Sequence, residues 1–197
     1  MNEDQSLAYI PIRRMLGTEE FVYQGQQVGS TLLEFWQWAF SELAGNTLRG
    51  TVAEYIVAMA AGLDKGVQIP WDACDLRLPG GRTLEIKTSG YLQTWKQSKL
   101  GRPSWSIAKS KAWDPQTNEF ALEPKRNSDT YVFCLHHHTD KSTINPLELD
   151  QWTFFVVPTA KIEATFGART RVGIRELNTL GATGLNFQDL RSSLALI

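Results

Sequence analysis

Apolar residues recur with a helical period early in the chain, over residues 32–43 (LLEFWQWAFSEL). This stripe follows Thr31, a good N-cap residue, which predicts an amphipathic helix. Phe35 and Trp38 fall off the stripe, so other elements or a second subunit could wrap this helix. The simpler interpretation, which we take as the prediction, is that the helix packs in the core of its own chain.

Four later segments also have clear patterns. Residues 47–61 are rich in alanine and end before Gly62, which predicts a helix stopped by that glycine. Uninterrupted apolar runs predict buried strands, and longer mixed segments predict helices on the outside of the sheet. The strands are Thr130–Leu135 and Trp152–Pro158, and the helices are Thr159–Phe166 and the residues from about Asn186 onward, after a short strand or loop near residue 172.

A period of two marks a pair of short strands, Trp71–Leu78 and Arg82–Thr88, separated by a Pro-Gly-Gly turn. With the turn centred near Gly80, paired residue numbers sum to about 160, which places Asp75 opposite Glu85. Strand alternation then predicts one polar face and one core face. The polar face would hold Asp75, Arg77, Thr83, Glu85 and Lys87, and the core face Leu76, Leu78, Leu84 and Ile86.

Together these elements predict a single domain of the α/β (α+β) class, in which helices flank a central mixed sheet of four to five strands. The domain would span residues 1–197, with its core over about 47–157, a helical extension over 1–46 and a closing helix over 186–197. The chain has 197 residues, 42% hydrophobic and 21% charged, which is an ordinary balance for one globular domain.

Composition restricts the location and the partners. No apolar run approaches the ~20 residues that cross a bilayer, and the acidic N-terminus is unlike a signal peptide, so we expect a cytoplasmic protein without a membrane partner. Cys74 and Cys134 lie in apparent strands, which favours buried free thiols in a reducing compartment.

The net charge is −1, but the charges are unevenly distributed along the chain. Residues 82–126 hold nine basic and four acidic side chains, whereas residues 1–64 hold three basic and eight acidic ones. A basic middle segment can form a surface that meets phosphates, while an acidic segment stays in solvent. The overall charge therefore does not exclude a nucleic-acid partner.

The predicted hairpin brings two carboxylates together, and such a pair is repulsive unless a cation lies between them. Oxygen ligands on a rigid hairpin suit Mg²⁺ or Mn²⁺, which share their coordination shell with water and substrate phosphate oxygens. Asp75 and Glu85 are therefore the predicted metal ligands. Lys87 projects from the same face, where its ammonium group would hold the attacking water or stabilise the pentavalent phosphorus.

Glu54 is a fourth candidate, from the helix over residues 47–61. Its neighbours one turn away are small or apolar, and a carboxylate on such a packed face is costly unless it is paired or bound to metal. We therefore expect Glu54 beside the metal, as a ligand through water or at a second ion. The alternative is a helix glutamate that reaches solvent or pairs with Arg49 or Arg82.

The order of these residues, Glu54 on a helix, Asp75 on a strand and then Glu85-Ile86-Lys87, resembles the PD-(D/E)xK, or restriction-endonuclease-like, superfamily. The resemblance covers residues 47–157 approximately and implies a mixed sheet flanked by helices. It further implies a Mg²⁺-dependent nuclease acting on DNA, with Asp75, Glu85, the main-chain carbonyl of Ile86 and, through water, Glu54 around the metal. Catalysis would fall to Glu54, Asp75, Glu85 and Lys87.

The chain departs from the family pattern at Cys74, which stands where the motif has a proline. Asp72 competes with Asp75 for the aspartate role. Strand alternation puts Asp72 on the other face, which favours Asp75.

Candidate substrate-binding residues follow the Glu-x-Lys motif. Ser89, Tyr91 and Gln93 share the parity of Lys87 and would extend the active face, unless they form only a polar strand exit. Beyond them, basic residues mix with Trp95, Trp105 and Trp113, a composition typical of surfaces that bind phosphates and stack on bases. The basic residues are Lys96, Lys99, Arg102, Lys109 and Lys111; the alternative is a solvated loop with core tryptophans.

The sequence thus predicts a DNA endonuclease, and double-strand cleavage makes a homodimer an attractive arrangement. Two alternatives stay open: a nucleic-acid-binding module of the same fold that does not cut, and a nuclease for RNA or branched DNA. The run from His136 to His138 is predicted to be a solvent-exposed strand end, because consecutive strand side chains alternate in direction and cannot converge on one ion.

Overall fold

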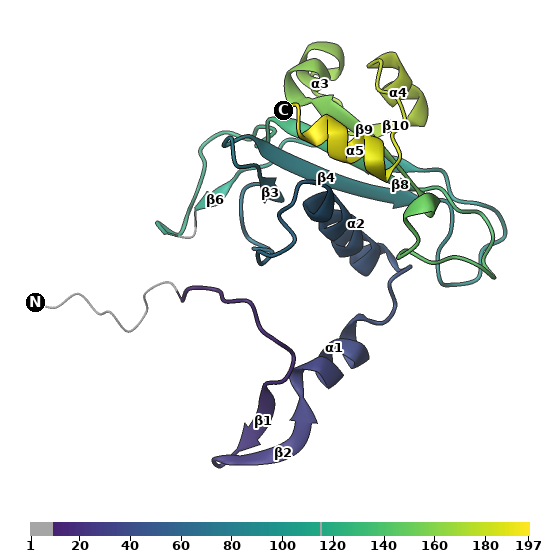
Figure 1. Ribbon diagram of the computed structural model, residues 1–197. Coiled ribbons are helices and arrows are strands. Elements are labelled where there is room, and N and C mark those ends of the chain that lie inside the picture. The colour runs from purple at the N-terminus through teal and green to yellow at the C-terminus, as the bar shows by residue number, and fades with distance from the viewer. Residues whose placement is uncertain (1–9, 115) are drawn as a thin grey trace, which may run out of the picture.

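The computed structural model describes residues 10–114 and 116–197, and its centre is a mixed sheet of four strands in the order β3-β4-β8-β9 (Figure 1). These strands are β3 (Leu76–Arg77), β4 (Thr83–Gly90), β8 (Thr130–His136) and β9 (Trp152–Pro158). β4 runs parallel to β8, and the other two pairs are antiparallel. The expected α+β class is confirmed, and β8 and β9 lie where the apolar runs predict them.

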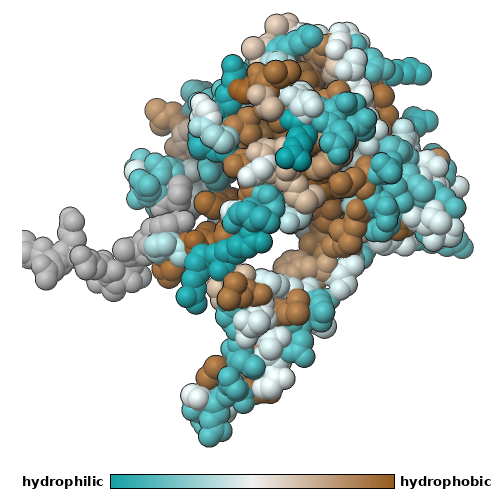
Figure 2. Space-filling view, in the orientation of Figure 1, coloured by the Kyte–Doolittle hydropathy of each residue, from teal (hydrophilic) through white to brown (hydrophobic). Residues whose placement is uncertain are grey.

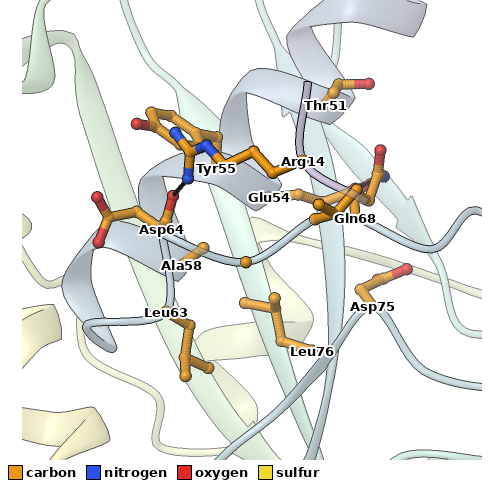
Figure 3. A pocket seen from close by; sticks show the side chains of 12 residues that line it. Arg14, Thr51, Glu54, Tyr55, Ala58, Leu63, Asp64, Gln68, Asp75 and Leu76 are labelled. Atoms are coloured by element: carbon orange, nitrogen blue, oxygen red, sulfur yellow. Dashed lines mark hydrogen bonds between the residues drawn. The ribbon is translucent and has the colours of Figure 1, made fainter. Parts of the chain in front are cut away.

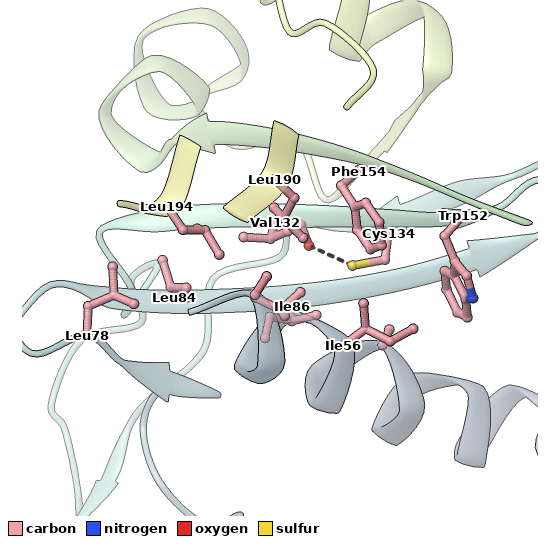
Figure 4. Packing of buried hydrophobic residues seen from close by; sticks show 13 residues of the cluster. Ile56, Leu78, Leu84, Ile86, Val132, Cys134, Trp152, Phe154, Leu190 and Leu194 are labelled. Carbon is pink, nitrogen blue, oxygen red and sulfur yellow. Dashed lines mark hydrogen bonds between the residues drawn. The ribbon is translucent and has the colours of Figure 1, made fainter. Parts of the chain in front are cut away.

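One face of the sheet packs against two helices, α2 (Asn46–Ala60) and α5 (Phe187–Leu194). Even-numbered residues of β4 and β8 point to this face, so Leu84 and Val132 meet Ile56 of α2 and Leu190 of α5 (Figure 4). All four side chains are almost fully buried. Burial of this kind contributes about 1.5–3 kcal/mol for each large aliphatic side chain and supplies most of the stability of such a layer.

The opposite face carries a second core. It is closed by α3 (Thr159–Phe166), α4 (Ile174–Thr179) and a ribbon of β5 (Ser104–Ser106) with β10 (Arg171–Gly173). Trp105 lies at its centre, with its ring edge-on to Phe133 and Phe155 and its indole N–H donating to the carbonyl of Cys134. Because Trp105 is only 1% exposed, the prediction that it stacks on nucleic-acid bases is wrong.

The ends of the predicted helices agree with the sequence signals. α2 ends before Gly62, whose φ of +72° is the left-handed conformation that glycine adopts at low cost, and the N–H of Leu63 donates to the carbonyl of Ala58 at 2.8 Å. Asn186 caps α5 through its side chain. α3 covers the residues expected of it, whereas α4 was not expected.

The hairpin register is the predicted one. Leu76 pairs with Leu84 and Arg77 with Thr83, so each pair of numbers sums to 160. The first strand is much shorter than Trp71–Leu78, because residues 71–75 form turns and bends. Asp75 lies just before the first paired residue, and its N–H donates to the carbonyl of Leu84 at 3.0 Å, so the expected pairing of Asp75 with Glu85 is not part of the ladder.

The expected polar face of the hairpin is only partly exposed to solvent: Arg77 is exposed, whereas Glu85 and Lys87 are half-buried. β4 and β8 are in parallel register, with Glu85 beside Tyr131 and Lys87 beside Phe133, both residues of the second core. Thr83 is buried and bonded to Asp129. The sequence pattern of β4 alone could not reveal that residues far along the chain cover its other side.

The N-terminal part differs most from expectation. Residues 1–9 lie outside the described part of the chain, and the extension expected to be helical over 1–46 is helical only over α1 (Leu32–Phe40). Before it come the strands β1 (Glu20–Tyr23) and β2 (Gln26–Thr31), which pair with each other. No residue of α1 is buried, so the prediction that this helix packs in the core is wrong: it leads away from the sheet (Figure 1).

His136 is a second correction, because the expected exposed strand end is buried. Its ring stacks on Trp152 at 4.6 Å between centroids, and Nε2 lies 3.2 Å from the amide oxygen of Gln151. The alternation argument could not foresee that β9 supplies an aromatic partner across the antiparallel pair. Cys74 and Cys134 are free and buried, as predicted, although Cys74 lies in a bend.

Smaller elements complete the chain: β6 (Trp113–Asp114) pairs with β7 (Glu119–Phe120), and a short helix (Leu149–Gln151) precedes β9. None of the helices in residues 10–114 and 116–197 has the length and apolar character of a membrane-spanning segment.

Candidate functional site

Four predicted site residues lie near the edge of β4 beside the first residue of β3, Leu76, close enough for the charges of Asp75, Lys87 and Glu85 to act on Glu54. Glu85 and Lys87 project from β4, and the Lys87 ammonium lies 2.5 Å from Glu85 Oε1. The second carboxylate oxygen of Glu85 accepts a hydrogen bond from the hydroxyl of Ser128 at 3.2 Å. The two side chains keep 20% and 31% of their surface exposed, so the pair is accessible to a small ligand.

Asp75 fills the position that a longer β3 would occupy. Because β3 starts only at Leu76, the N–H of Ile86 has no strand partner, and it donates to Asp75 Oδ2 at 2.5 Å instead. In an antiparallel pair the N–H and C=O of one residue point to the same side. The carbonyl of Ile86 therefore also points to the edge at which Asp75 lies.

Glu54 reaches this edge from α2. Its carboxylate accepts a hydrogen bond from the side-chain amide of Gln68, in the loop that follows the helix. Glu54, Gln68 and Asp75 line a cavity of about 220 Å³, which Tyr55 and Arg14 also border (Figure 3). Glu54 thus stands between the sheet edge and an open cavity.

The carboxylates disfavour one another's charge. Burial and the nearby charge of Asp75 raise the pKa of Glu54 to about 7, against lowering contributions from Gln68 and Lys87. Burial and the charge of Glu85 likewise raise the pKa of Asp75, although the hydrogen bond from Ile86 opposes this. At neutral pH the cluster holds more negative charge than its neighbours compensate, which is the electrostatic condition that favours a cation.

The donor set fits a hard divalent cation better than a soft one. Carboxylate oxygens and a main-chain carbonyl are the ligands that Mg²⁺ and Mn²⁺ take, usually with several waters. Within residues 10–114 and 116–197, however, no three His, Cys, Asp or Glu side chains form a group that could hold a metal as they stand. Lys87 contacts one oxygen of Glu85 and Ile86 one oxygen of Asp75, so a cation would compete with Lys87 for Glu85 Oε1.

Asp72, the competing aspartate, lies apart from this cluster. Its side chain is exposed and accepts a hydrogen bond from the next residue, Ala73, at 2.6 Å. The geometry therefore supports Asp75 as the site aspartate.

Of the three residues expected to extend the active face, Ser89 and Gln93 make contacts within the fold, and Tyr91 borders a groove. Ser89 Oγ accepts from the N–H of Ser104 at 3.1 Å, and Gln93 Oε1 lies 3.5 Å from the Arg49 guanidinium. Tyr91 borders a surface groove with two arginines, Arg102 and Arg175. Of these three residues only Tyr91 opens on a charged groove.

The five basic residues predicted to bind substrate are all exposed and fall at different places on the surface: Lys96, Lys99, Arg102, Lys109 and Lys111. Lys109 lies 3.3 Å from Glu163 of α3, and Arg102 lies in the groove beside Arg175. Lys96, Lys99 and Lys111 are exposed without an ion pair to a described carboxylate. Of the tryptophans predicted to stack on bases, Trp95 is 56% exposed, whereas Trp105 is buried.

Sequence reasoning missed several residues of the site. Gln68 and Ser128 bond directly to Glu54 and Glu85, and Arg14 borders the cavity with its guanidinium bonded to the carbonyl of Asp64. Each comes from a loop or an extended segment without periodicity. Only the fold brings them to the motif residues, so no local pattern could have identified them.

The chain matches no protein-family model and no curated protein. The resemblance to PD-(D/E)xK nucleases therefore depends on the order and the geometry of Glu54, Asp75, Glu85 and Lys87 alone.

Proposed function

We propose that this chain is a Mg²⁺- or Mn²⁺-dependent nuclease that hydrolyses phosphodiester bonds of DNA as an endonuclease, with the site arrangement of the PD-(D/E)xK superfamily. The observation that carries the proposal is that Glu54 and Asp75 line one cavity, while Glu85, paired with Lys87, lies close enough to Asp75 for its charge to act on it. Burial together with a neighbouring carboxylate raises the pKa of Glu54 and of Asp75, and perturbed titratable groups beside a cavity are typical of functional sites.

Asp75, Glu85 and the Ile86 carbonyl would hold the cation, with Glu54 joining through water. The bound ion supplies a water of lowered pKa and neutralises charge that builds up on the phosphorus. Lys87 turns from Glu85 to the substrate, where it donates to the attacking water and to a phosphoryl oxygen. Gln68 and Ser128 hold the carboxylates of Glu54 and Glu85 in place.

Hydrolysis adds one water across one P–O bond. The water oxygen bonds to phosphorus, the bond between phosphorus and the leaving sugar oxygen breaks, and that oxygen takes up a proton. In-line attack needs the scissile phosphate to approach the edge of β4, and the shortness of β3 leaves this edge open. The exposed basic residues, with Arg102 and Arg175 in one groove, can hold the flanking backbone.

The test is a panel of labelled duplex, single-stranded and junction DNA and RNA, incubated with Mg²⁺, Mn²⁺ or chelator. We expect cleavage of DNA that the chelator stops, and loss of cleavage in Lys87→Ala with folding and DNA binding retained. Lys161→Ala, which removes an exposed lysine on α3, is the matched control and should cleave normally. Full activity of Lys87→Ala, or retention of DNA without product under every condition, would refute the proposal.

A further inference from the structure

The segment of residues 17–45, which we call the arm, comprises β1, β2 and α1 and projects from the body (Figure 1). It is well formed: Thr31 and Glu34 make a reciprocal capping box, the N–H of Leu33 donates to the carbonyl of Gly17, and Trp36 packs on Gly17. Gly17 is nonetheless the only buried residue of the arm. A hairpin and a helix of nine residues are marginal in water without a packed face.

The arm exposes large apolar side chains, some of which form brown patches on it in Figure 2. Trp38 is 85% exposed, Tyr23 68%, Val22 60% and Leu33 50%. At ~150–250 Å² for each aromatic side chain, the exposed apolar surface of the arm is on the order of 800 Å², which is what each partner contributes to a standard protein interface. An exposed apolar surface of this size is typical of a site that binds another protein surface.

The body offers an apolar groove of matching character. It has a volume of about 480 Å³ and runs along the outer side of α2, where Val52, Tyr55 and Met59 face Pro146 and Leu147. Leu147 is 64% exposed, and the carbonyl of Pro146 accepts from the indole N–H of Trp152, which fixes that wall. α1 of the same chain leaves this groove unfilled, since Trp38 at its outer side is almost fully exposed.

The charge of the arm indicates what kind of surface can cover it. The arm contains Glu19, Glu20, Glu34 and Glu42 and no lysine or arginine. Nucleic acid and anionic lipid surfaces are repelled by such a segment. The occupant must therefore be a protein surface, and this chain itself presents one apolar projection and one apolar groove that remain separate within a single copy.

We propose that two copies of this chain form a two-fold symmetric dimer by exchanging arms, with α1 of each copy seated in the groove between α2 and Pro146–Leu147 of the other. An exchange of this kind buries both apolar surfaces of both copies at once and forms a closed assembly. The residues between α1 and α2, Ser41–Gly45, act as the hinge, and Glu42 anchors the hinge to the body by accepting a hydrogen bond from Thr94.

The exchange also touches the candidate site. Thr51 and Tyr55 border both the groove and the cavity beside Glu54. A seated arm would therefore back the wall of that cavity, a consequence that depends on the proposed function, whereas the dimer itself does not.

The first test is mass in solution, by light scattering across a wide concentration range. We expect about 44 kDa, twice the 22.2 kDa of one chain, and for Trp38→Asp a dissociation constant raised at least ~30-fold. Leu147→Asp, on the groove side, should have the same effect, and Leu122→Asp, at a residue 88% exposed on neither surface, should have none. Because both altered residues are exposed, circular dichroism should be unchanged. A monomer at every concentration, or a dimer that survives both substitutions, would overturn the proposal.

The second test identifies the partner surfaces. Chains carrying Trp38→Cys are mixed with chains carrying Leu147→Cys and oxidised, with the natural cysteines Cys74 and Cys134 buried in both. A disulfide-linked pair that forms in the mixture and in neither variant alone can arise only between copies. A third sample is the chain that carries both Trp38→Cys and Leu147→Cys, oxidised at low concentration. If the disulfide forms within single chains of that variant and never between chains in the mixture, α1 folds back on its own groove, and the exchange is overturned.

Discussion

Two polar clusters lie along β4, and they are built in opposite ways. Beyond the end of the strand, buried Arg49 donates to the carbonyl of Leu92 and to the side chain of Asn46, both at 2.7 Å. His136, beside Gly90, is held neutral because burial lowers its pKa to about 4, with a smaller contribution from Arg49. Near the start of the strand, in contrast, Glu54 and Asp75 line one cavity, and both have raised pKa values.

The difference separates polar residues that stabilise the fold from those arranged for chemistry. The cluster at Arg49 pairs both terminal guanidinium nitrogens with carbonyl and amide oxygens, which are neutral acceptors, and leaves only Nε without a partner. The cluster at Glu54 places like charges together and lowers the stability of the chain until a cation arrives. Substitutions in the two clusters should therefore affect different measurements.

The largest effect is expected in the carboxylate cluster, on activity. Asp75→Asn should lower DNA cleavage by ~10²–10³-fold, since it removes one charged ligand beside the reacting phosphate. The free energy of unfolding should not fall in chelator, because a repulsive charge is lost. Steady-state cleavage and urea unfolding measure the two quantities. Asp72→Asn is the control, and an equal loss of activity there would mean that the wrong aspartate is assigned.

The converse is expected for Arg49→Met, which should leave the cleavage chemistry intact but cost about 1–3 kcal/mol of stability, because it leaves the buried carbonyl of Leu92 without its donor. Urea unfolding is the measurement. Arg82→Met, at an exposed arginine, should change stability by less than about 0.5 kcal/mol. Similar values for the two variants would show that the buried arginine does not anchor this end of β4.

Acidic pH should lower the free energy of unfolding through the cluster at His136. A neutral histidine with a folded pKa of about 4 contributes stability that is fully present above pH 6.5 and is lost as pH falls through 4. The loss should reach about 3 kcal/mol. His136→Gln should remove this part of the slope, which unfolding curves between pH 7 and 4 would measure. An unchanged slope would place the titrating group elsewhere.

For the carboxylate cluster the pH dependence is reversed: stability should fall as the pH rises. Glu54 keeps its proton in the folded chain up to a pKa of about 7 but loses it near 4.5 when unfolded, so stability falls as pH rises from 4.5 to 7. In chelator, Glu54→Gln should be more stable than the natural chain at pH 8 by about 1–3 kcal/mol and similar to it at pH 4. Equal stability at pH 8 would contradict the proposed repulsion.

The smallest effect is expected from the cation itself. Mg²⁺ at ten times its dissociation constant should stabilise the chain by about 1.4 kcal/mol at pH 8, which raises Tm by a few degrees for a domain of this size. Thermal unfolding with Mg²⁺ and with Ca²⁺ measures the shift, and Glu85→Gln provides the matched control. A shift that persists in Glu85→Gln would indicate binding at another place.

The sequence predicts the elements that depend on local or pairwise rules. The turn at Gly80 sets the register that brings Asp75 to Glu85, and alternation along β4 puts Glu85 and Lys87 side by side. Gly62 ends α2 as expected. These residues act through neighbours that are close in sequence or joined by one short turn.

The sequence could not predict contacts made by distant layers. The sequence predicts an exposed His136, but in the structure Trp152 stacks on it. It predicts that Trp105 binds a ligand, but residues of β8 and β9 pack around its ring. The stripe of α1 indicates a buried helix, yet its own chain covers the stripe only in part and leaves no residue of α1 buried. An apolar pattern predicts that a face of a helix or strand is buried, but it does not identify the element or chain that packs against this face.

The brevity of β3 has a consequence for association between chains. An exposed strand edge with free N–H and C=O groups invites another molecule to add a strand, which is how many proteins begin to form fibrils. Here β3 ends after two residues, and the Asp75 carboxylate takes the next N–H of β4, that of Ile86. The same side chain that we assign to the cation thus also guards the sheet against growth by backbone pairing.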